Sequence, residues 1–170
     1  MQVSDKNFNN IKIHTQYSIC EGAIKIDNLK DFCKDKKIPC LGLSDTSNLC
    51  GALEFAENIS KVGTQPIIGT QIYFRFEDTT GLLPLIALNE NGYKKIIELS
   101  SRSYLENDAL SDPHLDIKEL LIDTEGVSLL SGTIQGLFGK LFEKGRLDEI
   151  SKLYKSLSSK FNDNFYLEIQ

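Results

Sequence analysis

The 170-residue sequence contains no tryptophan, only two histidines and only four cysteines. No two cysteines are spaced as C-x-x-C, which excludes a zinc ribbon and a thioredoxin-type dithiol. Isolated cysteines of an intracellular protein are typically small, buried apolar side chains, and we expect this of all four. They are Cys20, Cys33, Cys40 and Cys50.

The sequence also lacks an excess of positive charge and any long apolar run. Its 19 Lys and Arg residues against 24 Asp and Glu residues leave a net charge of −5. If the protein belongs to a nucleic-acid machine, we therefore expect it to hold another protein rather than to clamp DNA unaided. No apolar run approaches the roughly 20 residues of a membrane span, and the first residues lack the pattern of a signal peptide. We therefore expect a cytoplasmic protein without membrane contact.

Strand-like and helix-like segments alternate along the chain, which predicts one α/β domain with a parallel sheet or barrel and helices outside it. We interpret Asp27 as the N-cap of the first helix and Pro84 as the mark of a sheet edge or strand end. The expected strands are 11–16, 40–44, 66–74, 82–88, 127–132 and 165–169. The expected helices lie between 27 and 39, between 49 and 63, and over 92–104, 117–122, 137–144 and 148–161.

The carboxyl ends of the strands are the places to look for function, because side chains gather there in parallel α/β folds. His14, Asp45 with Thr46, Gln71 and Ser131–Thr133 occupy these ends. Neither G-x-x-x-x-G-K-[ST] nor G-x-G-x-x-G followed by a suitable acid occurs, which excludes nucleotide binding through those loops.

In order and spacing, these segments resemble the PHP (polymerase and histidinol phosphatase) domain that begins the alpha subunits of bacterial DNA polymerase III. The resemblance implies a distorted seven-stranded (β/α) barrel related to the TIM barrel. Residues 1–170 would be the N-terminal part of this single domain, truncated at its C-terminal end, with the rest of the barrel and a polymerase core beyond Gln170. The matching blocks are Ile13–Ser18 with Glu21–Ala23, Leu43–Asp45, Asn48–Phe55, Pro66–Gly69, Asn89–Tyr93, Leu130–Gly132 and Phe165–Ile169.

The resemblance also implies a pocket in which His, Asp, Glu and sometimes Cys side chains hold up to three divalent metals for phosphoester hydrolysis. Most of those donors are replaced here. The His-x-His motif is Lys12-Ile13-His14, and a protonated lysine has no lone pair to donate. The Thr-Asp-His motif keeps Asp45 but has Thr46, and the glutamate after Pro-Ile-Ile-Gly is Gln71.

An acidic ligand survives as Glu21, whereas an expected histidine corresponds to Leu82 and an expected cysteine to Thr133. Only His14 and Glu21 are then left to contact a metal directly, and a catalytic zinc needs about three protein ligands. We therefore expect no catalytic residue, bound metal or cofactor here, but a vestigial metal pocket. Its members are Lys12, His14, Glu21, Asp45, Thr46 and Gln71.

Simpler interpretations stay open for single residues. His14 is better explained as a hydrogen-bonded histidine at a strand end than as a metal ligand, and Asp45 is equally explained as the cap of the turn before Asn48. For Lys12 we predict that its charge replaces the metal's charge beside Glu21 and Asp45, because two buried carboxylates without a cation are costly.

The resemblance implies that this stretch is a non-catalytic scaffold of a replicative DNA polymerase. The nucleotidyltransferase chemistry, with its Mg²⁺, and the main DNA contacts would lie in downstream domains. The implied partners are the proofreading exonuclease (epsilon) subunit and other replicase subunits. Two alternatives remain: a divalent-metal phosphoesterase or proofreading nuclease, and a free-standing PHP phosphatase, which the polymerase-like block 48–55 disfavours.

Overall fold

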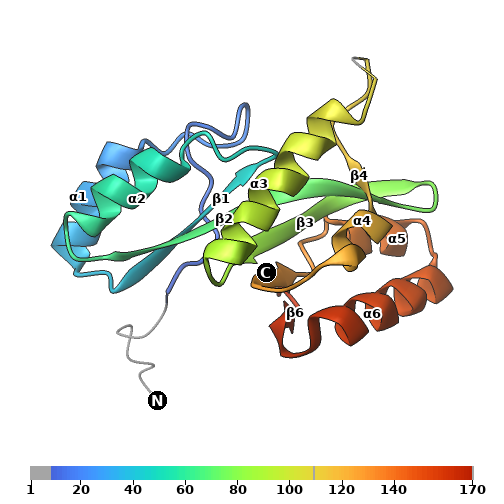
Figure 1. Cartoon of the computed structure of the whole chain (residues 1–170). Helices are drawn as coiled ribbons and strands as arrows, with labels where there is room; N and C mark the ends of the chain where they lie inside the picture. The colour runs from blue at the N-terminus through green and yellow to red at the C-terminus, as the bar shows by residue number, and fades with distance from the viewer. Residues whose placement is uncertain (1–8, 109, 170) are drawn as a thin grey trace.

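The computed structural model describes residues 9–108 and 110–169, which form an α/β fold around one six-stranded sheet (Figure 1). The predicted α/β class is confirmed. The strands are β1 (Cys40–Thr46), β2 (Gln65–Phe76), β3 (Thr79–Ala87), β4 (Leu115–Asp116), β5 (Val127–Leu130) and β6 (Phe165–Tyr166). The helices are α1 (Ile26–Lys36), α2 (Ala52–Ser60), α3 (Glu90–Leu105), α4 (Ile117–Ile122), α5 (Leu137–Glu143) and α6 (Leu147–Phe161).

The strands lie in the order β1-β2-β3-β5-β6, with β4 beside the far half of β2. β1 and β2 are parallel, as are β5 and β6, but β3 runs antiparallel to both β2 and β5. The prediction of an all-parallel sheet is therefore wrong at its centre. β2 ends later and β3 begins earlier than expected, so only Glu77 and Asp78 separate these two strands. A two-residue connection can only form a hairpin.

The segment expected as the first strand runs beside β1 without forming a named strand: it makes a bridge from Ile13 to Leu43, and backbone hydrogen bonds join it to Gly42 and Ser44. Gly42 permits this approach, because a Cβ atom there would lie 2.2 Å from the carbonyl oxygen of Ile11. The prediction that Asp27 is the N-cap of α1 is wrong, because Lys25 holds that position and Asp27 lies in the first turn. Pro84 marks a ladder end inside the sheet, because pairing of β3 with β5 begins at Leu85.

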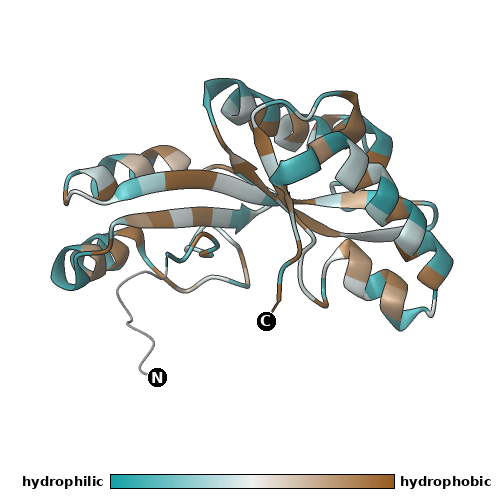
Figure 2. Cartoon of the chain, turned by 90° about the horizontal axis from the view of Figure 1, so that it is seen from below, coloured by the Kyte–Doolittle hydropathy of each residue, from teal (hydrophilic) through white to brown (hydrophobic). Residues whose placement is uncertain are grey.

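Two hydrophobic clusters hold the elements together. One packs β1 against α1 and α2. The other packs the four strands β2, β3, β4 and β5 against α3, α4, α5 and α6. Figure 1 shows α3 crossing the middle strands while α5 and α6 lie together at the other side, and Figure 2 shows apolar residues in brown along the strands. Burying this apolar surface supplies most of the favourable free energy of folding.

Some large apolar side chains of the first two helices are at the surface. Phe32 and Leu53 are 50% and 70% exposed, because α1 and α2 bury only the narrow faces that carry residues such as Leu29 and Phe55. Of the cysteines, Cys33 is buried and Cys40 half-buried, whereas two are exposed, so the prediction of four buried cysteines is wrong for Cys20 and Cys50. None of the helices in the described part of the chain is long and apolar enough to cross a membrane.

Candidate functional site

A cavity of about 410 Å³ brings together most of the positions singled out in the sequence. Its walls come from the segment before β1, from β2 and β3, and from the loop between β5 and α5. The predicted positions Lys12, His14, Glu21 and Gln71 line it, as do Leu82 and Thr133, with Gly132, Gln135 and Gly136 completing the wall. Residues as far apart in sequence as Lys12 and Gly136 thus meet at one site, as the strand-end argument predicted.

A chain of hydrogen bonds occupies one wall of this cavity. The parallel register of β1 and β2 places Thr46 opposite Gln71. The amide of Gln71 donates to the hydroxyl of Thr46 over 2.8 Å, and this hydroxyl donates to the carboxylate of Glu21 over 2.5 Å. Thr46 and Gln71, two of the residues that replace metal donors, are therefore hydrogen-bonded to each other, and the hydroxyl of Thr46 holds Glu21 in place.

His14 lies beside this chain but has few close partners. Its Nδ1 is 3.4 Å from the hydroxyl of Ser18 and 3.9 Å from the carboxylate of Glu21. Within 9–108 and 110–169, no three His, Cys, Asp or Glu side chains lie close enough together to hold a metal ion. The structure therefore brings His14 and Glu21 together and adds no third donor of those types to them.

Asp45 is fully buried and takes no part in lining the cavity. One of its oxygens accepts hydrogen bonds from the backbone N–H of Thr15 and the hydroxyl of Ser18, at 2.6 and 2.7 Å. The other accepts from the hydroxyl of Thr15 at 2.7 Å. Asp45 thus ties the segment at 15–18 to the end of β1, and it does not cap the turn before Asn48.

Lys12 contacts a residue that the sequence analysis did not consider. Its ammonium group lies 2.8 Å from a carboxylate oxygen of Glu168, and the two side chains are only 15% and 13% exposed. The prediction that Lys12 pairs with Glu21 and Asp45 is therefore wrong. Glu168 lies in the family-like block Phe165–Ile169, but no sequence signal pairs it with Lys12, because 156 residues separate the two.

Two tyrosines near the cavity have raised pKa values. The hydroxyl of Tyr17 donates to Glu54 over 2.6 Å, and this hydrogen bond to a carboxylate raises the pKa of Tyr17. Burial raises the pKa of Tyr73, and the nearby charge of Glu21 adds to the effect. Both phenols therefore stay protonated at neutral pH, where Tyr17 serves as a hydrogen-bond donor.

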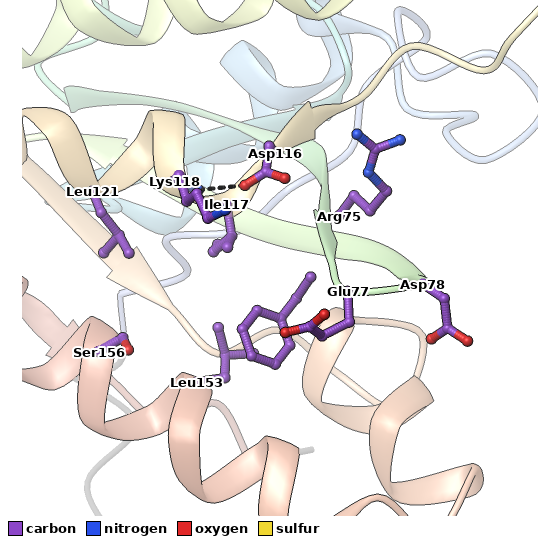
Figure 3. Close-up of a pocket in the computed structure, with 10 residues that line it drawn as sticks. Arg75, Glu77, Asp78, Asp116, Ile117, Lys118, Leu121, Leu153 and Ser156 are labelled. Atoms are coloured by element: carbon purple, nitrogen blue, oxygen red, sulfur yellow. Dashed lines mark hydrogen bonds between the residues drawn. The ribbon is translucent and has the colours of Figure 1, made fainter.

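A second hollow, of about 620 Å³, lies between the β2–β3 hairpin, the start of α4 and the side of α6 (Figure 3). Two of its three acids have structural partners: Asp116 accepts a hydrogen bond from the backbone N–H of Lys118, and Asp78 pairs with Arg146. Leu153 of α6 closes the opposite wall. This hollow contains no group of residues that indicates chemistry.

A family model of the PHP domain matches residues 10–170 of this chain. The chain belongs to the PHP domain family. The resemblance inferred from short sequence blocks is thereby confirmed, and curated relatives match nearly the whole of this PHP domain.

Three of these relatives are each named DNA polymerase III subunit alpha. The protein from Caulobacter vibrioides is 35% identical over 174 residues, which cover 97% of this chain. Those from Vibrio cholerae and Thermus aquaticus are 31% and 32% identical and cover 98% of it. The chain spans about 15% of the length of each relative.

The donor set of this PHP domain does not fit a divalent metal ion. His14 and Glu21 are the two side chains of ligand type on the cavity wall, and catalytic zinc sites use about three protein ligands. The hydroxyl and the amide at Thr46 and Gln71 are already hydrogen-bonded to each other, and the ammonium of Lys12 cannot donate a lone pair. Among residues 9–108 and 110–169, the cavity wall therefore offers fewer donors than the about three protein ligands of a catalytic zinc site.

Proposed function

We propose that this PHP domain is a non-catalytic scaffold of a DNA polymerase III alpha subunit and that it holds the proofreading exonuclease subunit. In this proposal residues 1–170 are the first part of a PHP domain that continues beyond Gln170. Nucleotide addition with Mg²⁺ and the main DNA contacts belong to later domains of the same cytoplasmic protein, and other replicase subunits complete the assembly.

Two observations together carry the proposal: the alpha-subunit relatives match nearly the whole of this chain, and most of the metal donors that the family uses are replaced in it. Relatives named as alpha subunits align with 97–98% of the chain, yet the cavity offers two donors of ligand type. A domain that keeps its fold without its chemistry is best explained by a role in binding. The net charge of −5 supports a protein partner over DNA, because nucleic-acid affinity depends on neutralising phosphates.

Tethering gives such a domain a physical function. A second binding event within one complex proceeds at an effective concentration that reaches the millimolar range for short connections. A proofreading exonuclease held on the polymerase would therefore meet the primer end far more often than a free one. No contact between the PHP domain and DNA is required.

The test is capture of the cognate exonuclease subunit by the full-length alpha subunit with and without residues 1–170. We expect the exonuclease to bind the complete subunit and to be lost from the deletion variant. Nucleotide incorporation on a primed template by the deletion variant serves as the control that its remaining domains fold. Undiminished capture by an active deletion variant would place the tether elsewhere.

Hydrolysis of a chromogenic phosphodiester in Mn²⁺ or Zn²⁺ separates the scaffold from a metal-dependent phosphoesterase. The scaffold proposal predicts equal hydrolysis rates in the wild type and in the double variant His14→Ala with Glu21→Gln, whereas a phosphoesterase would lose its activity in the double variant. A rate that depends on these two residues would refute the non-catalytic assignment.

A further inference from the structure

We draw no further inference here: the strongest candidate, the largely apolar groove of about 890 Å³ between the segment before β1 and the residues that follow β6, carries nothing because no feature of residues 9–108 and 110–169 shows what covers it.

Discussion

Replacing Asp45 by alanine is the sharpest test of how the end of β1 is organised. The side chain is fully buried, and its two oxygens accept three hydrogen bonds, two from Thr15 and one from Ser18. Alanine would leave those three donors without their acceptor in a site that water does not reach. Each unsatisfied buried donor costs about 1–3 kcal/mol.

The simple sum of these costs is an upper limit. Removing a buried carboxylate also removes its own desolvation cost, and the segment at 15–18 can relax toward solvent. We therefore expect Asp45→Ala to lower the free energy of unfolding by about 3–5 kcal/mol, the lower part of the range that three unsatisfied donors give together. Asp45→Asn keeps one oxygen acceptor, so its cost should be about 1–2 kcal/mol.

Urea unfolding of the full chain, followed by far-UV circular dichroism, measures these differences. Asp31→Ala, on the exposed surface of α1, is the control and should change the free energy by less than about 0.5 kcal/mol. A loss below about 1 kcal/mol for Asp45→Ala would refute the reasoning, because the three hydrogen bonds would then have little structural value.

Two further predictions concern the hairpin and the start of α3. The hydrogen-bonded Arg146 lowers the pKa of Asp78 from 3.8 to about 2, so the pair stabilises the fold above pH 4 and loses its effect as the pH falls toward 2. Asp78→Asn should therefore have a lower urea midpoint than the wild type at pH 6, and the difference should shrink as the pH falls toward 2, where Asp78 is half protonated. A difference independent of pH would contradict this. In Gly92→Ala, the new Cβ would lie 1.8 Å from the carbonyl oxygen of Gly126, so α3 must shift, at a cost of about 1–3 kcal/mol in the same assay. Gly63→Ala, with φ of +81° and no atom within 4 Å, should cost about 1 kcal/mol from backbone strain alone, and an equal loss in both variants would argue against the contact.

The order of helices and strands was predictable because it depends on local patterns. Apolar periodicity located α3, α4, α5 and α6 and most of β1, β2, β3 and β5, with errors at the ends. The direction of β3 was not predictable from the alternation of segments. It depends on how far two strands extend before the turn at Glu77, where φ is +53°, and pairing between strands decides that length.

The loss of metal donors was readable from the sequence because it concerns the chemistry of single side chains. Lys12, Thr46 and Gln71 cannot supply what histidine and glutamate supply, wherever they lie. What those residues do instead was not readable. The hydrogen bond from Gln71 to Thr46 depends on the register of β1 with β2, and its continuation to Glu21 depends on the path of a loop.

The sequence alone therefore determined the α/β class and the family, since these follow from periodicity and short motifs. Only the tertiary structure decided which groups became partners. It turned Asp45 inward to hold the segment at 15–18, and it paired Lys12 with Glu168 across 156 residues. The reason is physical: contacts between distant residues form only where the packed sheet brings its two ends together, and no local pattern records that position.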